Sequence, residues 1–311
     1  MIKLFKKVKN KIEVIVMKSF RSDFADELLD TIIENEDYIL KKKSFKDVTL
    51  THVKILKESK KLNKKAGNYL SVDFQNIYEA TSRHHISDVL TKALSQIHKI
   101  KKNEKILIVG LGNNNIIADS LGPAVCDKIV VTNHLFKLFP EEIDKDTKKV
   151  CVFTPKVMGQ TGLESSDLIK AICNLFNPSL VILIDSLASS SIQRINRVIQ
   201  ISDDGIAPGS GIGNIRKPIN KEILNVPIIA IGVATVVDAS QIVSEAFNKY
   251  FEKTKEKLKQ KEKRQAVNEV LNNKQLSLVV TPKEIDEDIE HLSTIISSSL
   301  NKFIHDNEQT H

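Results

Sequence analysis

The amino-acid sequence predicts an α/β fold: a doubly wound, mostly parallel sheet with helices on both faces and an antiparallel hairpin at one edge. Three observations support this prediction. Short apolar runs rich in β-branched residues recur along the chain, as strands buried on both faces require. Stretches with helical periodicity alternate with these runs, which is the pattern of parallel strands joined by crossover helices. Two segments of alternating polarity near the N-terminus flank a Gly-Asn turn, which is typical of a hairpin.

The composition limits the class of protein. The chain has 311 residues, of which 41% are hydrophobic and 27% charged, as in an ordinary globular domain with a large core. The net charge is +7, but the lysine runs lack the aromatic and arginine residues of a nucleic-acid surface, so we interpret them as solvated faces. Three cysteines without CxxC spacing indicate a reducing compartment. Apolar runs fall short of the roughly 18 residues of a membrane span, so we expect a cytoplasmic protein with no membrane contact.

The first half of the chain contains the hairpin and the central strand. A basic segment opens the chain and leads into a helix-like stretch that ends near residue 36. The elements expected after it are strands at 48–56 and 69–74, a helix at 78–98 with one apolar face, a buried strand at 105–110 and a helix from about 122 to 136. The short strand 105–110 is apolar on both faces, so we place it at the centre of the sheet.

The second half continues the alternation of strands and helices. It predicts strands at 149–155, 180–184, 197–202, 226–233 and 276–280, and helices at 164–176, after 233, and from about 283 to 304. Residues 249–275 are so rich in lysine and glutamate that they indicate an exposed insertion. With no repeat and no Gly/Ser linker, we expect residues 24–311 to form one domain and residues 1–23 to form a mobile arm or pro-segment.

Two acidic residues follow apolar strands at positions suited to chemistry. Asp119 lies in the loop after strand 105–110, and Asp185 comes directly after strand 180–184. Open α/β sheets place their sites at the carboxyl ends of strands, so the two carboxylates can be neighbours. Such a pair can share a proton and serve as general base and general acid. The alternative is that Asp119 caps the next helix and Asp185 caps a turn.

Glycine-rich loops are expected to line the cleft around these acids. The loop at 203–217 and the turn at Gly110 to Gly112 lack the spacing of a dinucleotide fingerprint and any GK[ST], so nucleotide binding is disfavoured. The loop residues that we expect in the cleft are Gly112, Asn113, Gly159, Thr161, Gly209, Ser210 and Gly211. There is no HExxH and no GxSxG, and Cys126 lies on a predicted helix face, so we expect no metal, no cofactor and no serine or cysteine nucleophile.

Several segments together resemble those of the germination protease family of endospore-forming bacteria. They occur in the same order over most of the chain: Gly110–Asn113 with Asp119 and Leu121–Pro123; Val157–Gly162; Ile184–Ala188; Ile199–Ser202; Gly205–Gly211; Ile231–Val233 with Thr235–Ala239; and Thr281–Asp286. The resemblance is weak at residues 1–18, about 36–65 and 249–275.

The resemblance implies a function and a site. The family degrades the small acid-soluble proteins that coat DNA in dormant spores, so it implies an atypical aspartic-type endopeptidase of the spore core whose catalytic pair falls here on Asp119 and Asp185. It implies a fold related to that of hydrogenase maturation endopeptidases, a homo-oligomer, namely a tetramer, and a zymogen that trims its own N-terminus. The self-cleavage motif resembles Arg21 to Ala25, which would place the scissile bond between Asp23 and Phe24. The substrates would likewise be cut after an acidic residue and before Phe or Ile.

Two departures from the family pattern leave alternatives open. Ile117 and Ala118 stand where the family has Thr-Pro before the first aspartate, and Ala234 stands where it has proline. The loss of both prolines would loosen two turns of the cleft, so the chain could be a divergent, weakly active paralogue that binds spore protein or DNA. The motif around Asp119 also resembles hydrogenase maturation endopeptidases, which are shorter and lack the segments Gly205–Gly211 and Thr281–Asp286.

Overall fold

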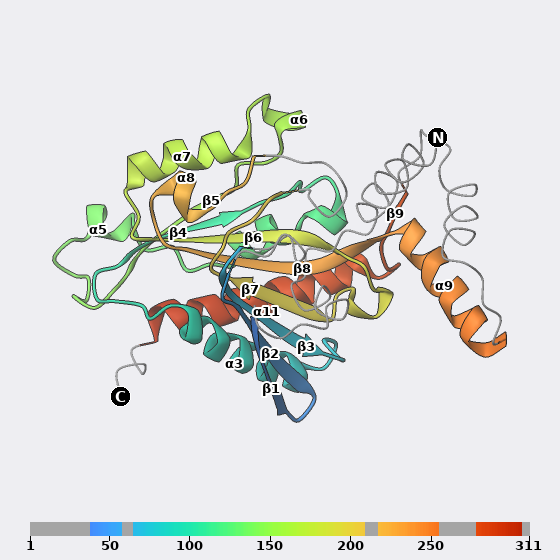
Figure 1. The fold of residues 1–311 in the computed structure, drawn as a ribbon. Coiled ribbons are helices and arrows are strands. Elements are labelled where there is room, and N and C mark those ends of the chain that lie inside the picture. The colour runs from blue at the N-terminus through green and yellow to red at the C-terminus, as the bar shows by residue number, and fades with distance from the viewer. Residues whose placement is uncertain (1–37, 58–64, 209–216, 255–277, 307–311) are drawn as a thin grey trace.

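The computed structural model describes residues 38–57, 65–208, 217–254 and 278–306 (Figure 1). Within these ranges nine strands form one sheet, in the order β1-β2-β3-β7-β8-β6-β4-β5 with β9 paired to β8. The strands are β1 (Tyr38–Phe45), β2 (Val48–Ile55), β3 (Gly67–Phe74), β4 (Lys105–Gly110), β5 (Lys149–Phe153), β6 (Leu180–Ser189), β7 (Val198–Ser202), β8 (Ile228–Asp238) and β9 (Val279–Val280).

The sheet has a parallel part and an antiparallel part. Strands β5, β4, β6 and β8 are parallel neighbours, and they are the buried apolar runs that the sequence indicates. The short link of residues 190–197 contains only the 3₁₀ helix η2 (Ile192–Arg194) between β6 and β7. A parallel return needs a longer crossover, so the chain reverses and β7 runs antiparallel to β8. The predicted α/β class is confirmed, but the prediction of a mostly parallel sheet is wrong: three strand pairings of the described residues are parallel and five are antiparallel.

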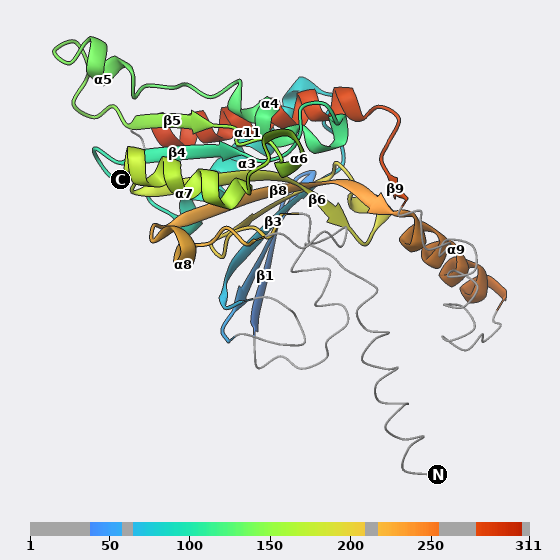
Figure 2. The same ribbon diagram turned by 90° about the horizontal axis from the view of Figure 1, so that it is seen from above.

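The predicted antiparallel hairpin is confirmed as part of a three-strand meander, but its turn is not Gly67-Asn68, because both residues belong to β3 and lie opposite Ile55 and Lys54. β2 and β3 pair antiparallel, with Val48 opposite Phe74, and β3 continues onto β7. The outermost strand, β1, was not predicted from the sequence. Its side chains are exposed along almost its whole length, so it lacks the alternation of buried and exposed residues that identifies a strand. Figure 2 shows this meander turned away from the plane of the parallel strands.

Helices cover both faces of the sheet, as predicted (Figure 1). On one face α3 (Ala80–Ile97), α4 (Leu121–Cys126) and α11 (Ile285–His305) contribute to the larger core. On the other face α7 (Ser165–Phe176) and α8 (Lys221–Leu224) pack on β4 and β6 through a second core. The remaining helices are α5 (Leu135–Leu138), α6 (Met158–Thr161), α9 (Ala239–Thr254) and the 3₁₀ helix η1 (Ile117–Asp119). No helix in these ranges is long and apolar enough to cross a bilayer.

The predicted helix at 122–136 is wrong in its length. α4 ends at Cys126, and the separate turn α5 begins at Leu135. Between them the chain runs beside β5, because the backbone N–H groups of Thr132 and Asn133 both donate to the Val150 carbonyl, at 3.3 and 3.1 Å. The Thr132 hydroxyl adds a bond to the Lys148 carbonyl at 2.5 Å. Contacts with the sheet edge therefore override the helical pattern of the sequence.

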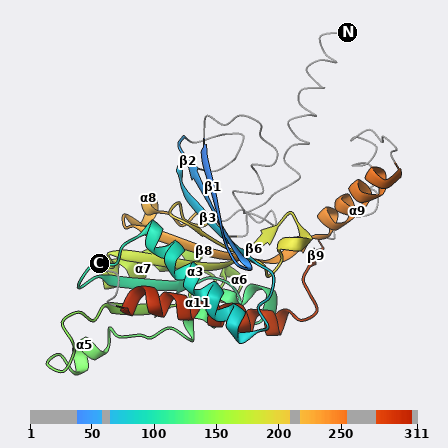
Figure 3. The same cartoon turned by 90° about the horizontal axis from the view of Figure 1, so that it is seen from below.

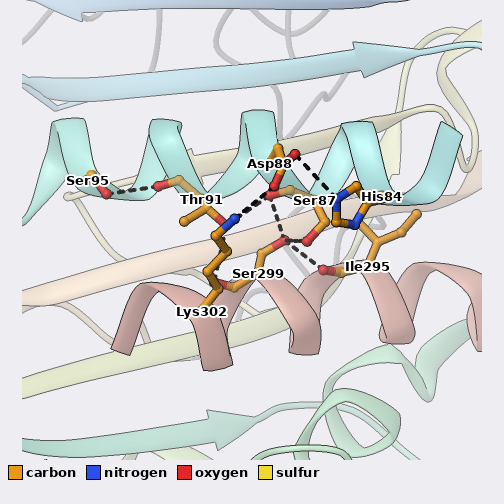
Figure 4. Close-up of polar contacts among 8 residues, drawn as sticks. All are labelled: His84, Ser87, Asp88, Thr91, Ser95, Ile295, Ser299 and Lys302. Atoms are coloured by element: carbon orange, nitrogen blue, oxygen red, sulfur yellow. Dashed lines mark hydrogen bonds and ion pairs between the residues drawn. The ribbon is translucent and has the colours of Figure 1, made fainter. Parts of the chain in front are cut away.

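The last helix packs along α3 through small polar side chains. Ser87 and Ser299 share a hydrogen bond of 2.9 Å between their hydroxyls, and the Thr91 hydroxyl donates to the Ser87 carbonyl at 2.9 Å (Figure 4). We call this interface between α3 and α11 the seam. At its exposed edge Lys302 forms an ion pair with Asp88 at 3.1 Å. Because serine is short, the two helices approach closely, and together they cover one face of the sheet (Figure 3).

Three predicted segments lie wholly or largely outside the described residues. They are the proposed arm at 1–23, the helix-like stretch that ends near residue 36, and the charged insertion at 249–275, of which α9 covers residues up to Thr254. α9 begins where β8 ends and extends away from the sheet (Figures 1 and 2). Its first turn is fixed by Asp238, whose carboxylate accepts the backbone N–H of Ser240 at 2.8 Å.

Candidate active site

Asp119 lies in a tight loop that closes on the end of β4. The backbone N–H of Asn113 donates to the Asp119 carbonyl at 2.9 Å, and the N–H of Asp119 donates to the Ile116 carbonyl at 2.8 Å. Gly112 has φ +117°, and a Cβ on it would lie 2.0 Å from the Asp119 carbonyl and 3.2 Å from the Asp119 Oδ1. The loop can therefore close in this way only with glycine at position 112, and the Asp119 carboxyl lies against that glycine.

Asp185 lies in β6, in the strand next to β4. Its side chain is 5% exposed, and Oδ1 accepts the backbone N–H of Ser186 at 3.0 Å. The N–H of Leu111 donates to the Ile184 carbonyl at 2.8 Å, so the chain that leads to Gly112 and Asp119 is bonded to the residue before Asp185. The turn η1 that ends in Asp119 also contacts β6 and β8. The structure thus places both acids beside the carboxyl end of β4, because Gly110 lies opposite Ile184. The prediction that strand 180–184 ends before Asp185 is wrong: β6 continues to Ser189, since residues 185–189 also pair with β8.

A second predicted cleft loop joins this region. The side-chain amide of Gln160, in α6, donates to the Asn113 Oδ1 at 2.8 Å. Gly159 and Thr161 flank Gln160 and are exposed, and a Cβ on Gly159 would meet nothing within 4 Å. Of the predicted loop residues, Gly112, Asn113, Gly159 and Thr161 therefore come together. Gly209, Ser210 and Gly211, like Asp23 and Phe24, lie outside the described residues.

Other reactive side chains near the loop have structural roles. Cys126 is buried in the larger core beside Gly110, and burial raises the pKa of its thiol to about 12. A thiol with that pKa stays protonated at neutral pH, so Cys126 is a packing residue, as expected from the sequence. In the part of the chain that the structure describes, no three His, Cys, Asp or Glu side chains are arranged to hold a metal ion.

Two carboxyl groups beside the end of β4 have a specific chemical capacity. Asp119 is partly exposed, whereas Asp185 is buried. A pair of carboxyl groups can act as general base on water and as general acid towards a leaving group. This capacity fits hydrolysis of an amide bond. The catalytic role of the pair remains a prediction.

The family follows from comparison with known proteins. The model of the family described as "Germination protease" matches residues 17–257 and 248–311. The chain belongs to the germination protease family. Its relatives include the germination protease of Clostridium tetani, which is 40% identical over 82% of this chain and 84% of its own length. Those of Clostridium acetobutylicum and Geobacillus sp. are 37% and 35% identical and cover 92% and 93% of this chain, each over 95% of its own length.

Membership of the germination protease family confirms the resemblance seen in the sequence and makes the chain a peptidase of spore germination. One solved structure, a [NiFe] hydrogenase maturation protease from Thermococcus kodakarensis, also matches. It covers 68% of this chain and 98% of its own, at 17% identity and a TM-score of 0.35. A TM-score this low supports no conclusion about this chain.

The germination protease site includes residues that sequence reasoning missed. Thr235, in β8, is fully buried and donates its hydroxyl to the Ala118 carbonyl at 2.7 Å. Asn196, after η2, donates its backbone N–H to the Ala234 carbonyl at 2.7 Å. Ala118 and Ala234, which stand where the family has proline, therefore both accept hydrogen bonds. In the sequence, Thr235 is only one hydroxyl residue in an apolar stretch. Such a pattern does not show which group the hydroxyl bonds to.

Proposed function

We propose that this germination protease is an endopeptidase that initiates the degradation of small acid-soluble, DNA-coating spore proteins, with Asp119 and Asp185 as its catalytic pair. The observation that carries the proposal is that the loop after β4, which bears Asp119, is bonded to β6 at the residue before Asp185, within a chain of this family. The proposal includes these spore proteins as the substrates, the spore core as the location of the enzyme, and a tetramer as its oligomeric state.

The proposed reaction is hydrolysis by a water molecule between the two carboxyl groups. One carboxylate removes a proton from the water as its oxygen attacks the scissile carbonyl carbon. The other carboxyl, protonated at the start, donates its proton to the leaving amine as the C–N bond breaks. After one turnover the proton taken from water remains on the first carboxyl, so the pair again carries one proton. The reaction therefore needs no further reactant.

The proposed specificity is cleavage after an acidic residue and before Phe or Ile. Large apolar side chains are exposed beside the acids: Ile116 is 54% exposed, Ile117 is 50% exposed, and Met158, in the adjoining α6, is 41% exposed. Exposed apolar surface next to polar catalytic groups suits a substrate that carries an apolar residue after the scissile bond. The chain's own Asp23–Phe24 bond fits this pattern, and tethering raises its effective concentration, so we propose self-processing there.

N-terminal sequencing of stored protein tests the proposal. The wild type is expected to lose residues up to Asp23, whereas Asp119→Asn and Asp185→Asn keep the full N-terminus. Asp167→Asn is the matched control, because Asp167 forms an exposed ion pair with Lys217 at 3.0 Å and lies outside the site. Circular dichroism shows whether each variant is folded. Processing of both site variants at the wild-type rate would refute the catalytic pair, and failure of matured wild type to cut spore proteins would refute the substrate.

A further inference from the structure

β8 contains a bulge at the point where it passes the candidate site. Leu187 of β6 lies opposite Ala234, but the next residue, Ala188, lies opposite Val236. Thr235 is thus the extra residue between two paired neighbours. A bulge turns the side chain of the extra residue out of the regular alternation, and bulges occur often beside active sites.

Three hydrogen bonds fix this bulge to different parts of the fold. The Thr235 hydroxyl donates to the Ala118 carbonyl at 2.7 Å, in the turn that ends in Asp119. The Thr235 carbonyl accepts the Thr281 hydroxyl at 2.8 Å, in the segment that leads to α11. The Ala234 carbonyl accepts the backbone N–H of Asn196. The bulge is therefore held in place, and its one side-chain donor points at the residue before Asp119.

The turn that bears Asp119 is short and depends on such support. η1 has three residues, and its N-cap, Ile116, makes no side-chain capping bond. The bonds from the Asn113 N–H to the Asp119 carbonyl and from the Asp119 N–H to the Ile116 carbonyl close the loop on itself. The Thr235 hydroxyl joins this loop to β8. β8 pairs with β6, and Asp185 of β6 lies opposite Gly232 of β8. The Thr235 bond therefore links the backbone next to Asp119 to the strand that pairs with the strand of Asp185.

We propose that Thr235 is a positioning residue that sets the placement of Asp119 relative to Asp185; this inference rests on the proposed catalytic pair. Thr235 is fully buried and acts through the Ala118 carbonyl, not on the substrate. Its loss lowers the rate of the chemical step more than it weakens substrate binding, because the hydroxyl holds the Ala118 carbonyl beside Asp119. A small shift of this turn misaligns a reacting carboxyl, whereas an exposed apolar contact tolerates such a shift. A misplacement of about 1 Å lowers a rate by about 100-fold.

The test compares two substitutions of Thr235 with a matched substitution elsewhere. Thr235→Val keeps the shape and removes the hydroxyl, whereas Thr235→Ser keeps the hydroxyl. Thr132→Val is the control, since Thr132 is also buried and also donates its hydroxyl to a backbone carbonyl, far from the acids. The substrate is a peptide of residues 19–27 of this chain, added to matured enzyme. Thr235→Val is expected to lower kcat about 10- to 100-fold with KM within about twofold, and Thr235→Ser to restore kcat to within about threefold.

A second measurement does not depend on activity. Amide hydrogen exchange at Asn113 and Asp119, whose N–H groups close the loop, is expected to speed up in Thr235→Val and not in Thr235→Ser or Thr132→Val. Folded Thr235→Val with wild-type kcat and wild-type exchange would overturn the inference, as would an equal loss of kcat in Thr132→Val. If wild type cuts no such peptide, or Asp119→Asn keeps full activity, the proposed function fails, and the exchange rates still decide the role of Thr235.

Discussion

Gly112 is the residue whose replacement we expect to damage the candidate site most directly. Its φ of +117° lies in a region that side chains rarely adopt, and a Cβ there would lie 2.0 Å from the Asp119 carbonyl oxygen. Gly159, in the neighbouring loop, offers a matched control. A Cβ on Gly159 meets nothing within 4 Å, and its φ lies outside the range that strains an L-residue. Gly112→Ala and Gly159→Ala add the same methyl group at two places in one site.

The magnitude follows from the two surroundings. For Gly112→Ala we expect backbone strain and overpacking to cost about 2–5 kcal/mol of folding free energy, because the obstacle is backbone and not a flexible side chain. The Asp119 carbonyl must also move by more than about 1 Å, which lowers a catalytic rate by about 100-fold. Gly159 lies in α6, so we expect Gly159→Ala to leave the folding free energy unchanged or to stabilise the fold by up to about 1 kcal/mol.

Urea unfolding monitored by circular dichroism gives the stability of both variants, and the rate of cleavage after Asp23 gives their activity. Most domains have a total stability of about 5–15 kcal/mol, so the expected loss in Gly112→Ala is easily measured. The reasoning would be refuted if Gly112→Ala matched Gly159→Ala in both unfolding midpoint and cleavage rate. A loss of cleavage with unchanged midpoint would instead indicate that the loop alone rearranges, which still supports a role for its shape in the chemistry.

Two further predictions concern buried carboxylates. Asp288, 5% exposed, accepts the Tyr78 hydroxyl at 2.8 Å and the Asn196 side-chain amide at 2.6 Å. Asp288→Ala leaves the buried Asn196 amide without this acceptor, whereas the exposed Tyr78 can bond to water, so we expect a cost of about 2 kcal/mol in urea unfolding. Exposed Asp286→Ala in the same helical turn should cost under about 1 kcal/mol, and equal losses would contradict the prediction. Burial alone would raise the pKa of Glu104, but hydrogen bonds from His98 and from the Lys101 N–H outweigh it and hold that pKa below its ordinary value. The stability that this carboxylate contributes is therefore present above the unfolded-state pKa of about 4.3 and is lost as the pH falls through the lower folded-state pKa. Unfolding free energies measured from neutral pH to acid should fall less steeply for Glu104→Gln than for the wild type, and parallel curves would refute the assignment.

The sequence predicts those parts of the fold whose residues carry their own signal. β4 is apolar on both faces and β2 and β3 alternate, so these strands were identified with nearly correct ends. β6 and β8 were predicted to end at 184 and 233 but run to Ser189 and Asp238, because their polar and small residues stay in the sheet by pairing with each other. β1 was missed because its exposed lysines give no pattern. The helix after Asp119 was extended too far, because the bonds of Thr132 to β5 depend on a neighbour that is distant in sequence.

The candidate site divides in the same way. The closeness of the Asp119 loop to Asp185 follows from a general rule, that the carboxyl ends of parallel strands carry the site loops. The bond from Gln160 to Asn113 and the bulge at Thr235 follow from no local pattern, because each depends on how two loops or two strands are aligned in space. The sequence therefore predicts Gly112 and Asn113 in the loop of Asp119, but not the contact that Thr235 makes with that loop.

The seam between α3 and α11 has a consequence for how the protein becomes active during synthesis. Ser87 and Ser299, which meet in that seam, are separated by 212 positions in the chain, and α11 also contacts the turn that bears Asp119. A contact between such distant segments forms late, because a long stretch of chain must be made and ordered first. On the ribosome, residues 285–305 emerge after all the other described elements. We therefore expect a nascent chain to lack peptidase activity until α11 has been made and docks, which would delay self-digestion until that point of synthesis.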